Sequence, residues 1–123
     1  MTPLQNQAMF ERLLRPNRPT QDGYFDEYAP VVAVAFGAEW CGPCQRLDKD
    51  KITDLTPGVK WYYCDVDQND YTLGYCGLRS IPAFVLIQDG VINKNMLTGA
   101  GSVQAVVEWL ENNLTKVRDA RRA

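Results

Sequence analysis

The order of apolar and polar positions predicts alternating helices and strands along most of the chain. Residues 3–14 place apolar side chains at helical spacing, with Thr2 as the expected N-cap and Pro3 in the first turn. The continuous apolar run at residues 31–36 is typical of a strand that is buried on both faces. The aromatic-rich run at residues 59–66 predicts a second central strand.

The second half of the chain continues this alternation. Helices are expected at residues 44–55, 69–76 and from 103 onward, and strands at residues 83–87 and 91–97. Asp89 and Gly90 lie between the last two strands and predict a hairpin turn, and Ser102 is expected to cap the last helix. The pattern therefore predicts an α/β fold, a mixed central sheet of about four strands flanked by helices on both faces.

We divide the chain into three stretches within a single domain. Residues 1–30 form an N-terminal helix and a proline-containing loop, with one helical turn expected near residues 24–28. Residues 31–117 form the core, and residues 118–123 a basic C-terminal tail, expected to continue the last helix. A chain of 123 residues is long enough to bury a hydrophobic core without structural disulfides or a structural metal ion.

Composition narrows the classes of function. The net charge is −2, so no basic surplus indicates nucleic-acid binding. No segment has the length and apolarity of a membrane span, and the start lacks the pattern of a signal peptide. We therefore expect a cytoplasmic protein with reduced thiols. The sequence contains no histidine, which excludes Cys–His catalysis and every histidine-bearing zinc site.

Two cysteines stand three residues apart at the junction between a buried strand and a helix. Their motif consists of Trp40, Cys41, Gly42, Pro43 and Cys44. Backbone N–H groups at a helix start favour an anion, so Cys41 is expected to be the ionised, exposed and attacking thiol. Cys44 lies deeper in the first turn and would resolve the mixed disulfide, forming a disulfide with Cys41. Gly42 permits a tight turn, and Pro43 suits the first helical turn.

The other cysteines raise the alternative of a metal site. Cys64 and Cys76 would have to supply the second pair of ligands, but they stand on different expected elements, so we expect no metal. Cys64 is expected to pack inertly in the core, and Cys76 to be a bystander near the surface. Pro82 would open a strand, which a cis peptide bond after Ile81 would accommodate.

These motifs together resemble the thioredoxin family over residues 31–115. The resemblance rests on residues 38–44, 65–69 and 77–82, on the Asp89–Gly90 turn, and on Gly99 and Ala100 before the last helix. It implies a thioredoxin-like fold and a substrate groove bordered by Trp40, Ser80, Ile81, Pro82, Gly99 and Ala100. It also implies a monomer that reduces disulfide-bearing proteins, with no bound cofactor, a redox-active Cys41–Cys44 disulfide and thioredoxin reductase as the electron donor.

The chain departs from the family in three places. Ala35 stands where a buried aspartate is usual, and Tyr63 where its lysine partner is usual, which leaves an apolar pairing beneath Cys44. Glu39 is a candidate substitute base, although a solvated surface acid is the simpler interpretation. The usual first strand is expected to be missing. Lys49 replaces the usual mid-helix proline, which predicts a shorter and straighter helix.

Other functions remain open from the sequence. A dithiol oxidase or isomerase would use the same cysteines, although the residues Gly42 and Pro43 between them resemble those of reductases. A non-catalytic binding or accessory subunit would use the fold as a scaffold. An intact dithiol motif argues against that alternative.

Overall fold

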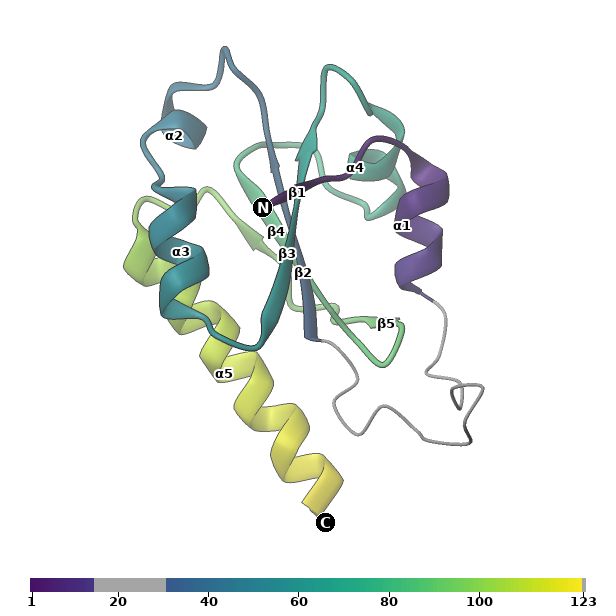
Figure 1. Ribbon diagram of the computed structural model, residues 1–123, viewed down its shortest axis with the longest axis vertical. Helices are drawn as coiled ribbons and strands as arrows, with labels where there is room; N and C mark the ends of the chain where they lie inside the picture. The colour runs from purple at the N-terminus through teal and green to yellow at the C-terminus, as the bar shows by residue number, and fades with distance from the viewer. Residues whose placement is uncertain (15–30, 123) are drawn as a thin grey trace.

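A six-stranded mixed sheet forms the centre of the computed structural model (Figure 1). The structure describes residues 1–14 and 31–122, with side chains as far as residue 114. The elements are β1 (Thr2–Pro3), α1 (Gln7–Leu13), β2 (Val31–Gly37), α2 (Gly42–Gln45), α3 (Lys49–Leu55), β3 (Val59–Asp65), α4 (Tyr71–Tyr75), β4 (Ala83–Gln88), β5 (Val91–Ile92), β6 (Leu97–Thr98) and α5 (Val103–Arg122). The turn predicted near residues 24–28 and the side chains of the basic tail lie outside this description.

The sheet mixes parallel and antiparallel pairs, as predicted. Its strand order is β1-β3-β2-β4-β5, and β6 also pairs with β4. β2 runs parallel to β3 and antiparallel to β4, so the predicted strands at residues 31–36, 59–66 and 83–87 are confirmed as its centre. Within the described residues, no helix is long and apolar enough to cross a membrane.

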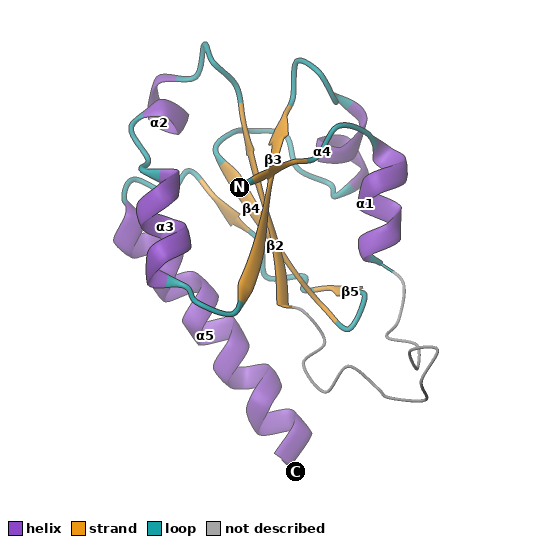
Figure 2. Ribbon diagram, in the orientation of Figure 1, coloured by secondary structure: helices purple, strands orange, loops and turns teal. Residues whose placement is uncertain are grey.

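Alternate residues of β2 face two separate helical layers. Figure 2 shows α3 and α5 on one side of the sheet and α1 and α4 on the other. Val34 and Phe36 are fully buried in the cluster that contains Phe10 of α1. Ala33 and Ala35 face the other cluster, where their small side chains leave room for the large side chains Trp61, Phe84 and Trp109. The helices therefore cover both faces, as expected.

The prediction that the first strand is missing was wrong. Thr2 and Pro3 form β1, which pairs in parallel with β3, and the next residue, Leu4, donates its N–H to the Tyr63 carbonyl at 2.8 Å. Helix α1 starts later than predicted, with Asn6 as its N-cap in place of Thr2. The open edge of β3 and the burial of Leu4 outweigh the local helix-start signal, and the fixed φ of proline suits an edge strand.

The predicted helix at residues 44–55 is interrupted, so the expectation of a straighter helix was also wrong. α2 ends at Gln45 and α3 begins at Lys49. Between them, the Asp48 side chain accepts a hydrogen bond from the Lys51 N–H at 3.1 Å and caps α3. An aspartate favours an N-cap over a helix interior, which explains the break without a proline.

The hairpin after β4 forms as predicted, but its second strand is short. Asp89 and Gly90 both have positive φ, which is typical of a two-residue hairpin turn. Only residues 91–92 and 97–98 of the expected strand are extended in the sheet. The Asn93 side chain accepts the Asn95 N–H at 2.8 Å and bends the chain between them. The Ser102 cap of α5 is confirmed by its hydrogen bond from the Ala105 N–H.

Candidate active site

The two motif cysteines lie where the central strand gives way to a helix. β2 ends at Gly37, and Cys41 is the N-cap of α2. Cys41 and Cys44 form a disulfide, with their Cα atoms 5.2 Å apart. The Cys44 N–H donates to the Cys41 Sγ at 3.2 Å. The Gln45 side-chain amide donates to the Ala38 carbonyl at 2.8 Å and ties the turn to the end of the strand.

Neither cysteine is exposed in this oxidised form. Cys41 is 5% exposed and Cys44 is 3% exposed, so the expectation of an exposed Cys41 was wrong here. Their surroundings differ, because the neighbours of Cys41 in the chain, Trp40 and Gly42, are exposed, whereas Cys44 lines a small cavity in the interior. The two cysteines therefore differ in their surroundings: Cys41 lies between exposed residues, and Cys44 lies next to an interior cavity.

Trp40 is fixed over the loop that follows β3. Its side chain is 69% exposed, and its indole N–H is shared by the two carboxylate oxygens of Asp67 at 2.9 and 3.1 Å. Asp65 in turn accepts the Asp67 N–H at 2.9 Å. Asp67 was not singled out for this role from the sequence, although it falls within the motif at residues 65–69.

An open cavity of about 470 Å³ adjoins the disulfide. It is lined by Trp40, Val66, Asp70, Leu73, Arg79, Ser80 and Ile81. Val66 and Ile81 also pack against the cluster formed by Ala38, Cys41 and Cys44, so this groove leads to the cysteines. Of the predicted groove residues, the structure brings Trp40, Ser80 and Ile81 together here.

The other three predicted groove residues do not line this groove. The Ile81–Pro82 peptide bond is cis, as predicted. Pro82 is buried and faces the cavity beneath Cys44, and its carbonyl accepts the Gly99 N–H at 2.9 Å. Ala100 is buried in the core on the α5 side of the sheet. The lining residues Val66, Asp70, Leu73 and Arg79 were missed, because folding brings them together from a loop, α4 and the segment before β4.

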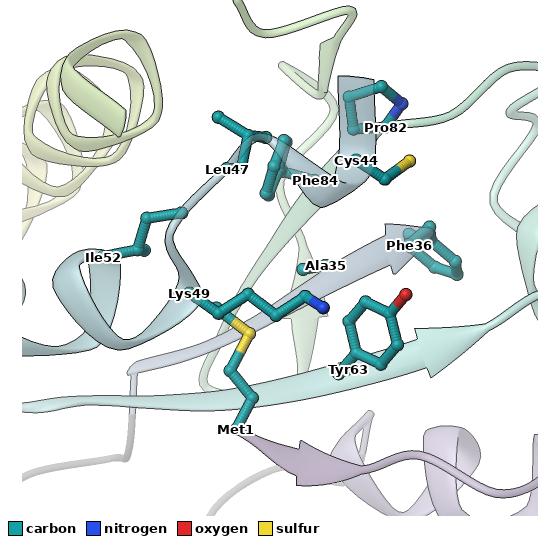
Figure 3. Close-up of a pocket in the computed structure, with 10 residues that line it drawn as sticks. All are labelled: Met1, Ala35, Phe36, Cys44, Leu47, Lys49, Ile52, Tyr63, Pro82 and Phe84. Carbon is teal, nitrogen blue, oxygen red and sulfur yellow. The ribbon is translucent and has the colours of Figure 1, made fainter. Parts of the chain in front are cut away.

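A second, smaller cavity of about 10 Å³ lies beneath Cys44 (Figure 3). The Tyr63 Oη lies 2.8 Å, and the Cys44 Cβ 3.3 Å, from the point that a Cβ on Gly37 would occupy. The Lys49 Nζ lies 4.0 Å from the centre of the Tyr63 ring. Burial, followed by the nearby Asp65 carboxylate, raises the pKa of Tyr63 above 10.0. The expected apolar pairing of Ala35 with Tyr63 therefore has a cation beside it.

The remaining cysteines are shielded thiols. Burial raises the pKa of Cys64 to about 12 and that of Cys76 to about 11, so both are neutral near pH 7. Across the described residues, no three His, Cys, Asp or Glu side chains come together as a metal-binding group. Glu39 is exposed.

Comparison with known proteins identifies the family. The family model described as Thioredoxin matches residues 20–112. A thioredoxin of Rickettsia bellii is 34% identical over 86 residues, which cover 68% of this chain and 81% of the relative. Chloroplastic thioredoxin M2 of Arabidopsis thaliana is 33% identical over 87 residues, covering 68% of this chain and 46% of the relative.

Solved structures share the fold. The crystal structure of thioredoxin from Trypanosoma brucei brucei has a TM-score of 0.74 at 20% identity and covers 94% of this chain and 91% of that one. Oxidised mitochondrial thioredoxin 3 from Saccharomyces cerevisiae has a TM-score of 0.70 at 25% identity, covering 91% and 94%. With its Cys41–Cys44 pair, this chain belongs to the thioredoxin family of thiol–disulfide oxidoreductases, which reduce protein disulfides.

Proposed function

We propose that this chain reduces protein disulfides in two exchange steps, with Cys41 attacking and Cys44 resolving. The Cys41 thiolate attacks one sulfur of the substrate disulfide, and the other substrate sulfur leaves as a thiolate. The Cys44 thiolate then attacks the Cys41 sulfur, forms the Cys41–Cys44 disulfide and releases the second substrate sulfur. The substrate gains two electrons, and the dithiol loses them.

The observation that carries this assignment is the unequal setting of the two sulfur atoms. Val66 and Ile81, both of which line the groove, pack against the cluster that contains Cys41, and the Cys41 sulfur accepts the Cys44 N–H. A hydrogen bond of this kind becomes stronger when the sulfur is ionised. Cys44, unlike Cys41, lines the second cavity, whose volume of about 10 Å³ leaves no room for a substrate polypeptide. Cys41 is therefore the sulfur that a substrate can meet.

The groove is proposed to hold the substrate chain. Its lining combines the apolar side chains of Trp40, Leu73 and Ile81 with polar groups at its rim. Pro82 and Gly99, which are joined by a backbone hydrogen bond, and Ala100 are proposed to border the substrate chain, and Ser80 to offer its backbone and hydroxyl groups to an extended peptide. Gly42 and Pro43 shape the turn that carries the cysteines.

Partners and location belong to the same proposal. Disulfide-bearing proteins are the substrates, and thioredoxin reductase is the electron donor, as is usual in the family. The chain acts as a monomeric single domain in the cytoplasm, with no cofactor besides its own disulfide and no nucleic acid. Gel filtration tests the monomer. Cell fractionation tests the location, which matters because relatives include chloroplastic and mitochondrial thioredoxins.

Reduction of insulin tests the chemistry. With dithiothreitol, and then with NADPH and a thioredoxin reductase, the wild type is expected to precipitate reduced insulin. Cys41→Ser is expected to fall to the rate without added protein, because no attacking sulfur remains. Cys44→Ser is expected to accumulate a mixed disulfide, visible by mass spectrometry.

The half-buried Cys76 provides the matched control. Cys76→Ser is expected to keep the wild-type rate, because its thiol is neutral near pH 7 and lies outside the disulfide. An inactive wild type would contradict the proposal and favour a non-catalytic scaffold. Full activity of Cys41→Ser would contradict the order of attack.

A further inference from the structure

The resolving step requires an ionised Cys44 in an apolar setting. Cys44 is 3% exposed, and the cavity beneath it is lined largely by apolar side chains such as Leu47 and Phe84. A thiolate is costly in such a place unless a polar group compensates its charge. Ala35, which lines the same cavity, carries no such group.

Two polar side chains reach this cavity from other elements. Among its lining residues, Tyr63 of β3 and Lys49 of α3 alone carry a polar side-chain nitrogen or oxygen. Figure 3 shows the Tyr63 hydroxyl turned toward Cys44 and the Lys49 amine beside the tyrosine ring. Within the described residues, the Tyr63 hydroxyl makes no hydrogen bond, so its proton is available to a new acceptor.

We propose that the Tyr63 hydroxyl, backed by the Lys49 ammonium group, stabilises the thiolate of Cys44 during the resolving step. Tyr63 donates the hydrogen bond toward the sulfur, directly or through the single water molecule that a cavity of this size can hold. Lys49 is a positioning residue, because its charge acts on the ring of Tyr63 and strengthens the O–H as a donor.

The step balances without another reactant. The Cys44 thiol releases its proton to water, and its sulfur attacks the Cys41 sulfur of the mixed disulfide. The bond between Cys41 and the substrate sulfur breaks, and the electron pair leaves with the substrate as a thiolate, which takes up a proton from water. Tyr63 keeps its own proton throughout.

The surroundings of Tyr63 keep its hydroxyl group protonated, so that it can donate a hydrogen bond. Burial and the carboxylates of Asp65, Glu39 and Asp67, together with the Cys64 thiol, all disfavour its ionisation and raise its pKa. The Lys49 ammonium faces the ring of Tyr63, and Met1 also lines the cavity. The phenol therefore stays protonated across the pH range in which thioredoxins are assayed.

The test separates attack from resolution in the full chain, and so rests on the proposed function. The reduced protein is mixed with excess dithiobis-nitrobenzoate, whose nitrothiophenolate product is coloured. The first release reports attack by Cys41 and scales with the reagent concentration. The second release reports resolution by Cys44 and does not scale with it. The rate of each phase is recorded as a function of pH.

Tyr63→Phe is expected to slow the second phase about tenfold at pH 7, the size of one lost hydrogen bond to a charged group. The midpoint of its pH profile should rise by about one unit, with the first phase unchanged. Lys49→Met should slow the second phase in the same direction, and Lys49→Arg, which keeps the charge, should restore it. Because Lys49 is only partly buried, its variants test the proposal even if Tyr63→Phe unfolds.

The neighbouring tyrosine is the matched control. Tyr62 is also half-buried on β3 with a lysine, Lys60, 5.5 Å from its ring centre, but it packs on the opposite face of the sheet. Tyr62→Phe is expected to leave both phases unchanged. The inference is overturned if folded Tyr63→Phe resolves at the wild-type rate at every pH. A missing first phase in the wild type would instead overturn the proposed function.

Discussion

Ala35 determines the electrostatic character of the space beneath the disulfide. It is 4% exposed and pairs with Tyr63 of β3 on one side and Phe84 of β4 on the other. No water reaches a side chain at this position freely, so a carboxylate here would lose most of its hydration. Lys49 lines the same cavity and would compensate only part of that loss.

We therefore expect Ala35→Asp to lower the free energy of unfolding by about 2 kcal/mol at pH 7, a typical cost of a buried and incompletely paired polar group. The buried carboxyl group would bind its proton more tightly in the folded than in the unfolded protein. The loss should therefore shrink as the pH falls from 7 to 4. Urea unfolding at both pH values measures it.

Ala35→Asn separates charge from size in this experiment. The amide has nearly the same volume, so it should destabilise the protein by an amount that does not change between pH 4 and pH 7. A variant Ala35→Asp that is more stable than the wild type at pH 7 would show that Lys49 compensates the charge fully.

Single-residue chemistry was the most predictable part of the site. The spacing of Cys41 and Cys44 and the proline at position 82 carry their meaning within a few neighbouring residues. The proposed role of Lys49 was not predictable from the sequence. Lys49 is the first residue of α3, after the interruption of the helix, and its amine contacts the ring of Tyr63 on β3. Contacts of this kind depend on tertiary packing, which no local pattern encodes.

At the level of elements, capping decides where the helix after the cysteines divides. Asp48 accepts the Lys51 N–H and starts α3, whereas the apolar spacing on either side is compatible with one continuous helix. The periodicity therefore located the helical region but missed its interruption. The first strand was missed for a related reason, because two residues are too few for a strand pattern and their pairing depends on the edge of β3.

Removal of the cap should weaken α3 measurably. Asp48→Ala is expected to lower the free energy of unfolding by about 1 kcal/mol, the usual cost of losing an N-cap side chain. Asp50 lies in the first turn of the same helix without a capping role, so Asp50→Ala should cost less than about 0.5 kcal/mol. Equal losses in the two variants would contradict the capping role of Asp48. Urea unfolding at pH 7 measures both.

At the scale of the whole molecule, no carboxylate or amine side chain among the described residues is buried. Among the described residues, the buried polar side chains are the neutral Thr56, Asn69, Thr72 and Asn113. The sequence has no histidine. The groups with raised pKa values are a tyrosine and two cysteines, all of which titrate well above neutrality.

The stability of the protein should therefore fall above pH 9. Cys64 and Cys76 bind their protons more tightly in the folded protein, with pKa values of about 12 and 11 against 9.0 for an ordinary thiol. Their contribution is present below pH 9 and is lost as the pH rises through about 11 for Cys76 and about 12 for Cys64. Urea unfolding across this range measures it.

A variant without these thiols supplies the control. Cys64→Ala combined with Cys76→Ser should show a smaller decline above pH 9 than the wild type, although its stability at pH 7 is lower. An equal decline above pH 9 in this variant and in the wild type would contradict the expectation.

The gap between α2 and α3 has a mechanical consequence for the redox cycle. The disulfide closes a small covalent ring around one turn, and the Gln45–Ala38 hydrogen bond anchors that turn to the end of β2. Reduction of the disulfide removes the covalent constraint on residues 41–44. Helix α3 is a separate helix that begins at Lys49 with Asp48 as its own N-cap. We therefore expect each catalytic cycle to change the conformation of residues 41–44 and to leave the sheet and α3 unchanged.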